Sequence, residues 1–118
     1  MAILFSRDDL SISITIDEEN GFNKLFFNDI IVYNLNREEF ELFAFFKVFE
    51  LFSKNMLEFK NYNYLLCDFE IVRKDKHYYL KFSFLLREKK YTYYFDKLEA
   101  GVIAEMFNRY KRLTKPKL

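Results

Sequence analysis

The sequence predicts an α+β protein in which an antiparallel sheet of about five to six strands carries two helices on one face. Short segments alternate apolar and polar residues, which is the period of a half-buried strand. Two longer segments place apolar residues at helical spacing, and each follows a polar residue that can cap a helix. Because strands, cap and helix occur twice, with Asn36 and Asp96 as the two caps, the sequence suggests a duplicated strand-strand-strand-helix unit.

Length and composition favour one domain. The chain has 118 residues, half of them apolar and a fifth aromatic, with only 2 glycines and 1 proline. A chain of this size buries roughly two thirds of its unfolded surface, so a core can form without disulfides or metal. We therefore expect one α+β domain over residues 1–114 and a basic flexible tail over 115–118.

The first half begins with a clear strand and ends with a helix. Isoleucines alternate with Ser and Thr over residues 11–16, and Asn20-Gly21 then favours a turn. Residues 22–35 read as two short strands, or one bent strand, broken near Asn28 and Asp29. Asn36, with Glu39 three residues later, is typical of a helix start. We expect this helix to reach residue 53 or 55.

The second half repeats this order with stronger alternation. Strands are predicted over 64–72, 77–87 and 91–95, separated by the charged turns RKDK and REKK. Asp96 has Glu99 three residues later, so it is predicted to cap a helix that continues to about Leu113.

The first helix is unusually rich in phenylalanine, with six in residues 37–52. Half of the helical wheel is apolar and should cover the sheet; it holds Phe45, Val48, Phe49, Leu51 and Phe52. Phe43 and Phe46 lie toward the polar side and need a second surface. We expect them to pack on small residues of the second helix, Ala100, Gly101 and Ala104. A homodimer interface made by the same rings is the alternative.

No motif in the sequence predicts catalysis, a cofactor or a metal site. Two glycines cannot build a phosphate-binding loop or a dinucleotide fingerprint, and there is no paired-cysteine spacing. The single histidine, His77, lies beside a turn, and the single cysteine, Cys67, falls on an apolar strand face without a nearby base. We therefore expect a protein that is not an enzyme.

Composition also bears on location and origin. One cysteine cannot form an intramolecular disulfide, and no apolar run reaches the roughly 18 residues of a membrane span. These features predict a cytoplasmic protein that does not enter a membrane. Residues with AT-rich codons make 55 of the 118 residues: Phe, Tyr, Asn, Lys and Ile. This composition favours an origin in a low-GC bacterium, its viruses or its mobile elements. A viral protein would act in the cytoplasm of the infected host cell.

Tyrosines and cations gather on one predicted strand face of the second half. Strand parity places Tyr79, Lys81 and Arg87 on it, with Lys90 and Tyr94 nearby, and the second helix and tail add Lys111 and Arg112. Rings that stack on bases and cations that hold phosphates are what single-stranded nucleic-acid binders use. Asp68 and Glu70 share this face, however, and can pair with Lys81, which would leave an ordinary surface of paired charges.

Strands followed by a helix, in duplicate, resemble the Whirly and PC4-like proteins in outline. This resemblance is one of topology, without a shared motif, and it implies a sheet that binds single-stranded nucleic acid. The overall charge of +1 does not favour it, since dedicated nucleic-acid binders usually carry a stronger basic excess.

A protein-binding module is the leading prediction. A small aromatic-rich domain without catalytic motifs suits a regulator, inhibitor or immunity protein, including the anti-defence proteins of phages. Residues 1–59 carry a net charge of −6 and residues 60–118 a net charge of +7. Such polarity suits an electrostatically complementary partner or self-association. Single-stranded nucleic-acid binding remains the alternative.

Overall fold

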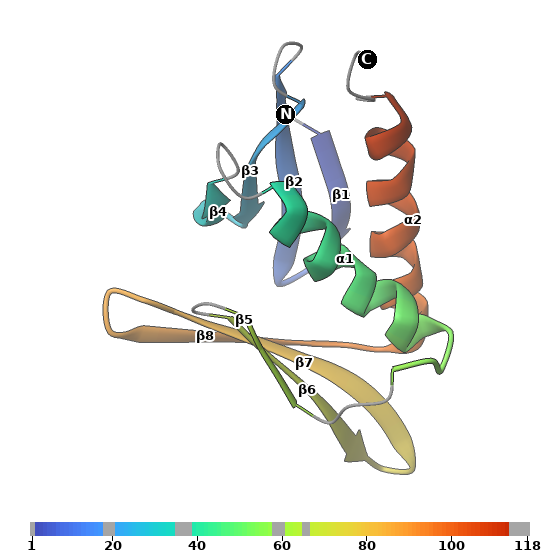
Figure 1. Ribbon diagram of the computed structural model, residues 1–118. Coiled ribbons are helices and arrows are strands. Elements are labelled where there is room, and N and C mark those ends of the chain that lie inside the picture. The colour runs from blue at the N-terminus through green and yellow to red at the C-terminus, as the bar shows by residue number, and fades with distance from the viewer. Residues whose placement is uncertain (1, 18–20, 35–38, 58–60, 65–66, 114–118) are drawn as a thin grey trace. The chain divides into compact units, whose positions relative to one another are not determined.

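The computed structural model describes residues 2–17, 21–34, 39–57, 61–64 and 67–113 (Figure 1). The side chains of 16–17, 21–23, 33–34, 39–43, 61–64, 67 and 111–113 lie outside the described part. Within it the elements follow the order β1 (Ala2–Arg7), β2 (Leu10–Asp17), β3 (Gly21–Phe27), β4 (Ile30–Asn34), α1 (Glu39–Ser53), β5 (Asn61–Tyr64), β6 (Cys67–Lys74), β7 (His77–Leu86), β8 (Lys89–Phe95) and α2 (Lys97–Leu113).

The strands form two antiparallel sheets, each with its strands in chain order. Sheet A has the order β1-β2-β3-β4, and sheet B has the order β5-β6-β7-β8. The α+β class predicted from the sequence is confirmed, but the strands make two sheets rather than the single shared sheet that was expected. Each sheet pairs only strands joined by consecutive hairpins, and a helix follows its last strand. The repeated unit is therefore four strands and a helix.

The described chain divides into two compact units. One comprises Met1–Lys47 with Val102–Leu118, and the other comprises Val48–Gly101. Sheet A belongs to the first unit and sheet B to the second, while both helices contribute residues to each unit. The predicted domain over 1–114 stays a prediction, and the tail predicted over 115–118 lies outside the described residues.

The core of the first unit is built from the inner face of sheet A and parts of both helices. Its buried strand residues include Ile12, Ile14 and Phe27, as the alternation predicts. Phe45 meets Phe27 edge to face, with ring centroids 6.3 Å apart. Phe46 stacks on Phe107 of α2 at 4.1 Å, with an angle of 11° between the rings.

This contact shows where Phe46, one of the two phenylalanines on the polar side of α1, packs. Phe46 is buried inside its own chain, so it belongs to the core and not to a dimer interface. Its ring partner on α2 is Phe107; its expected contact with the small residues of α2 stays a prediction. The side chain of Phe43 lies outside the described residues, as does the predicted cap Asn36.

The core of the second unit is a cluster of rings under the last turns of α1. Phe49 contacts Phe69 and Phe95 edge to face at 5.7 and 5.2 Å. Phe82, which is fully buried, lies 5.0 Å from Phe69. Edge-to-face pairs at these distances add about 0.5–1.5 kcal/mol each beyond the burial of their area.

Helix α2 begins at the predicted cap and approaches α1 closely. Asp96 Oδ1 accepts the backbone N–H of Glu99 at 2.7 Å, and Glu99 Oε1 accepts that of Asp96 at 3.0 Å, which is a capping box. A Cβ atom on Gly101 would lie 3.5 Å from that of Ser53. Gly101 therefore lets the end of α1 approach α2. Leu98, in the first turn of α2, is exposed.

Both long hairpins of sheet B turn through residues with left-handed backbone. Asp75 and Lys76 have φ of 51° and 67°, and Arg87 and Glu88 have φ of 49° and 67°. Two-residue loops with positive φ at both positions are type I′ turns, whose twist matches that of the strands. The charged turns predicted from the sequence are thus confirmed.

Candidate binding surfaces

The surface predicted from the sequence lies on the outer face of sheet B, the face opposite Phe69 and Phe82. The strand register places Glu70, Lys81 and Tyr94 side by side in one row across β6, β7 and β8. Tyr79 lies on the same face of β7, since it is two residues from Lys81. Lys90 faces the same way because it pairs with Leu85.

The residues of this face differ in their accessibility. Tyr94 is 48% exposed, Tyr79 is half-buried, and Lys90 and Arg87 are exposed. The side chain of Lys81 is only 27% exposed. Lys111 and Arg112, which were predicted to extend the surface, have side chains outside the described residues.

Charges on this face are mixed. Lys81 Nζ lies 3.8 Å from Glu70 Oε2, which is the cross-strand pair foreseen from the sequence. Asp68 follows Glu70 on the same side of β6, two residues away. The cations of the outer face are therefore interspersed with carboxylates, and the face has no uniform positive potential.

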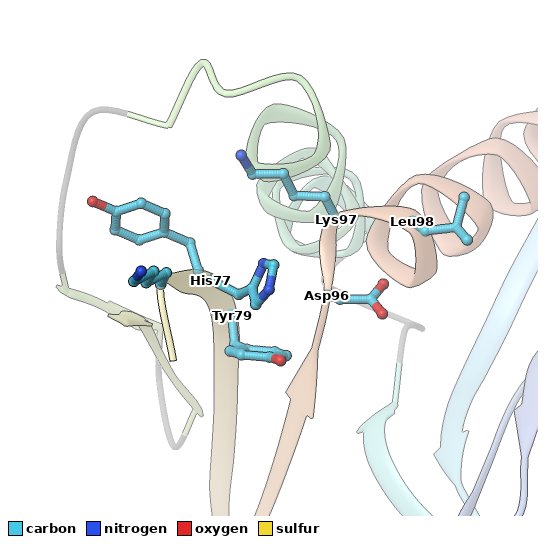
Figure 2. Close-up of a pocket in the computed structure, with 7 residues that line it drawn as sticks. His77, Tyr79, Asp96, Lys97 and Leu98 are labelled. Carbon is cyan, nitrogen blue, oxygen red and sulfur yellow. The ribbon is translucent and has the colours of Figure 1, made fainter. Parts of the chain in front are cut away.

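A pocket of about 450 Å³ opens where β7 begins and β8 passes into α2. It is lined by residues 76–79 and 96–98. In Figure 2 the rings of His77 and Tyr79 lie on the same side of β7, facing the segment that holds Asp96, whereas Leu98 points away. The Asp96 carboxylate already accepts the backbone N–H of Glu99. The pocket is therefore an aromatic recess at the end of the outer face.

A second, smaller pocket lies on the inner side of the same strand end. We call it the Tyr78 pocket; its volume is about 190 Å³ and its lining is Phe52, Asn55, Leu57, Ile71, Tyr78 and Lys97. Two cations approach the ring of Tyr78, Arg73 at 5.7 Å and Lys97 at 6.0 Å from its centroid. Sequence reasoning missed this site because alternation places Tyr78 on the core face, yet the strand end leaves it 49% exposed.

Sheet A has an outer face of different chemistry. The register runs Ile3, Ser13, Phe26, Ile31 across the four strands. Ile3 is 58% and Ile31 46% exposed, and Ser13 between them is buried. Scattered apolar residues on a surface are common, and this row carries no charge.

Within the described ranges, no three His, Cys, Asp or Glu side chains lie close enough together to hold a metal ion. Neither of the helices that the structure describes is both long and apolar enough to span a bilayer.

Comparison with known proteins gives no relative for this arrangement. No protein-family model, curated protein or solved structure matches the chain. Function therefore has to be argued from the surfaces of the two sheets.

Proposed function

We propose that the chain is a non-catalytic protein-binding regulator or inhibitor that contacts its partner through sheet B. The observation that carries this proposal is the pair of outer-face tyrosines on β7 and β8, half-buried Tyr79 and exposed Tyr94, which lie beside the Lys81–Glu70 ion pair. Tyrosine and arginine are the residues most enriched at the energetic centres of protein interfaces.

The balance of charge favours a protein over a nucleic acid. A phosphate backbone needs cations that are not already engaged, and its affinity comes largely from releasing counterions. Lys81 is engaged by Glu70, and Asp68 lies on the same face. Carboxylates there repel phosphates, whereas a protein partner can present cations to them and carboxylates to Lys90.

The test is capture of partners from cells that naturally make the chain. We expect the tagged protein to retain a partner that a Tyr79→Ser/Tyr94→Ser variant retains at least tenfold less. Ile3→Ser/Ile31→Ser is the matched control, because it replaces two large side chains on the outer face of sheet A. Equal retention by the tyrosine variant, or loss in the control alone, would contradict the proposal.

Single-stranded nucleic-acid binding is the second candidate. The aromatic recess in Figure 2, with Tyr79 and His77, continues into the row of Lys81 and Tyr94, and rings beside cations are the elements of a single-strand groove. The repeated order of four strands and a helix also keeps the outline of the Whirly and PC4-like proteins, as an analogy of topology.

This candidate has its own measurement. Labelled single-stranded oligonucleotides are titrated at two salt concentrations. Micromolar binding that weakens steeply with salt, and is lost in Lys81→Ala/Arg87→Ala, supports nucleic acid and displaces the protein proposal. Absence of binding at low salt eliminates the second candidate.

A further inference from the structure

The Tyr78 pocket combines a cationic rim with an apolar floor. Its floor is formed by Phe52, Leu57 and Ile71, of which Phe52 is buried in the core. Arg73 and Tyr78 are cross-strand neighbours in the register of β6 and β7, and Lys97 belongs to the first turn of α2. These residues thus belong to sheet B, to the parts of α1 and α2 that lie in the second unit, and to the segment that follows α1.

Among the described residues, no carboxylate positions the two cations beside the Tyr78 ring, Arg73 and Lys97. In the part of the chain that the structure describes, neither Arg73 nor Lys97 has an acidic group within ion-pairing distance. Their contacts with the ring of Tyr78 are cation–π interactions, which help to hold both side chains in place. Asp96, which precedes α2, and Glu99 in its first turn are engaged in the capping box.

Pocket size limits what can enter. A volume of about 190 Å³ is below the roughly 300–1,000 Å³ of small-molecule and cofactor sites. It suits one side chain of a peptide.

We propose that the Tyr78 pocket binds an acidic segment of the partner protein, with a Glu or Asp carboxylate paired with the cations beside the ring of Tyr78, Lys97 and Arg73, and an adjacent apolar side chain over Phe52, Leu57 and Ile71. This inference rests on the proposed function and specifies the chemistry of the partner. A nucleic acid fits less well, since base stacking needs an accessible ring face and the ring of Tyr78 is already contacted by two cations.

The experiment is fluorescence polarisation with a labelled nine-residue peptide of alternating Glu and Leu, compared with its Gln/Leu counterpart. We expect the Glu peptide to bind at low salt and the Gln peptide to bind at least tenfold more weakly. Arg73→Gln/Lys97→Gln should reduce affinity for the Glu peptide at least tenfold. These side chains are on the surface, and circular dichroism checks that the variant remains folded.

The control variant removes the same number of positive charges at positions away from the Tyr78 pocket. Lys89→Gln/Arg109→Gln also removes one lysine and one arginine; Lys89 lies over the ring of Tyr91, and Arg109 pairs with Glu105. Its affinity for the Glu peptide should stay within about twofold of the unchanged protein, since general attraction between distant exposed charges is screened.

Three results overturn the inference. The first is equal binding of the Glu and Gln peptides, and the second is an equal loss in the pocket variant and its control. The third is an oligothymidylate that binds more tightly than the Glu peptide and is released by Arg73→Gln/Lys97→Gln. If the partner captured in cells persists with Arg73→Gln/Lys97→Gln while the Glu peptide fails to bind, this inference fails and the proposed function stands.

Discussion

Sheets A and B have the same topology and unlike surfaces. Each is a meander of four antiparallel strands that precedes a helix. The outer face of sheet A presents an uncharged row with Ile3 and Ile31 at its ends, whereas that of sheet B presents tyrosines, lysines and carboxylates. The fold is therefore repeated in the two halves, and the chemistry available for recognition is not.

The turns of the two sheets also differ in which residues occupy their left-handed backbone positions. In sheet A the left-handed position between β3 and β4 is taken by Asn28, whose side-chain oxygen accepts a hydrogen bond from the backbone N–H of Ser11 in β2. In sheet B the four left-handed positions are taken by charged residues, among them Lys76 and Glu88, for which positive φ is costly. Sheet B therefore accepts local strain while placing charges at both ends of its tyrosine surface.

The largest effect is expected from removing a buried ring in either unit. Phe27→Ala in sheet A and Phe82→Ala in sheet B should each lower the free energy of unfolding by about 3–5 kcal/mol, because both rings are fully buried. Guanidinium unfolding followed by circular dichroism measures this loss. Phe26→Ala is the control on the opposite face of β3 and should cost clearly less.

The same unfolding curves test whether the two units behave as one domain. Helices α1 and α2 contribute residues to both units, so we expect a single transition that both Phe27→Ala and Phe82→Ala move to lower denaturant. Two transitions, of which each variant moves only one, would show that the expected single domain is wrong.

A smaller loss is expected at the Asn28 turn. The Oδ1 of Asn28 accepts the backbone N–H of Ser11 at 2.9 Å, and the backbone φ of Asn28 is 56°. Asn28→Ala removes the hydrogen bond and places a Cβ-bearing residue without compensation at positive φ, so we expect a loss of about 1–2 kcal/mol. Asn28→Gly separates the two causes: it loses the bond but relieves the backbone, and a loss as large as that of Asn28→Ala would refute the backbone contribution.

Turns in sheet B should respond in the opposite direction. Glu88→Gly and Lys76→Gly put glycine at positions with φ of 67° and should stabilise the protein by about 0.5–1 kcal/mol each, since type I′ turns favour glycine there. Thermal unfolding should show a midpoint higher by a few degrees. A lower midpoint would mean that these side chains make contacts worth more than the backbone strain.

The smallest effect concerns pH and belongs to sheet A. The hydrogen bond from Arg7 to Asp9, with Nε and Oδ1 2.6 Å apart, lowers the pKa of Asp9, and partial desolvation opposes it. A carboxyl whose pKa falls on folding contributes stability above its unfolded pKa of about 3.9, and this contribution disappears as the pH falls through the folded pKa.

Because Asp9 is largely exposed, the contribution should be a few tenths of a kcal/mol at most. In an NMR titration of the Asp9 carboxyl, Arg7→Gln should raise its pKa toward the ordinary value. An unchanged pKa would show that Arg7 is not the cause.

Much of the fold could be predicted from local pattern. Alternation over residues 77–86 placed Leu80, Phe82 and Phe84 in the core, and the spacing of Asp96 and Glu99 located the start of α2. These features are encoded by neighbours in the sequence, so no tertiary information was needed.

Two strands and the division into sheets could not be predicted in this way. β1 has the sequence AILFSR, with a register shift between Ile3 and Phe5 that breaks its alternation, and β5 has the sequence NYNY, which is too short and polar to stand out. Without them the strands were too few for two sheets. Which strands share a sheet depends on pairing between segments distant in sequence, which periodicity does not specify.

The candidate surfaces show the same limit. Strand parity put Tyr79 and Lys81 on one face, with Tyr94 nearby, and allowed for the pairing of Lys81 with Glu70. The Tyr78 pocket could not be predicted from strand parity, because Arg73 and Lys97 reach the ring of Tyr78 from different elements.

Photo-cross-linking from the two sheets tests the central claim most directly. A benzoylphenylalanine at Tyr94 reports on the outer face of sheet B, and one at Ile31 reports on that of sheet A, in cells that naturally make the chain. Our account predicts a covalent complex with a protein from position 94 and none from position 31. A complex from position 31 alone, or cross-linking from position 94 to nucleic acid, would contradict it.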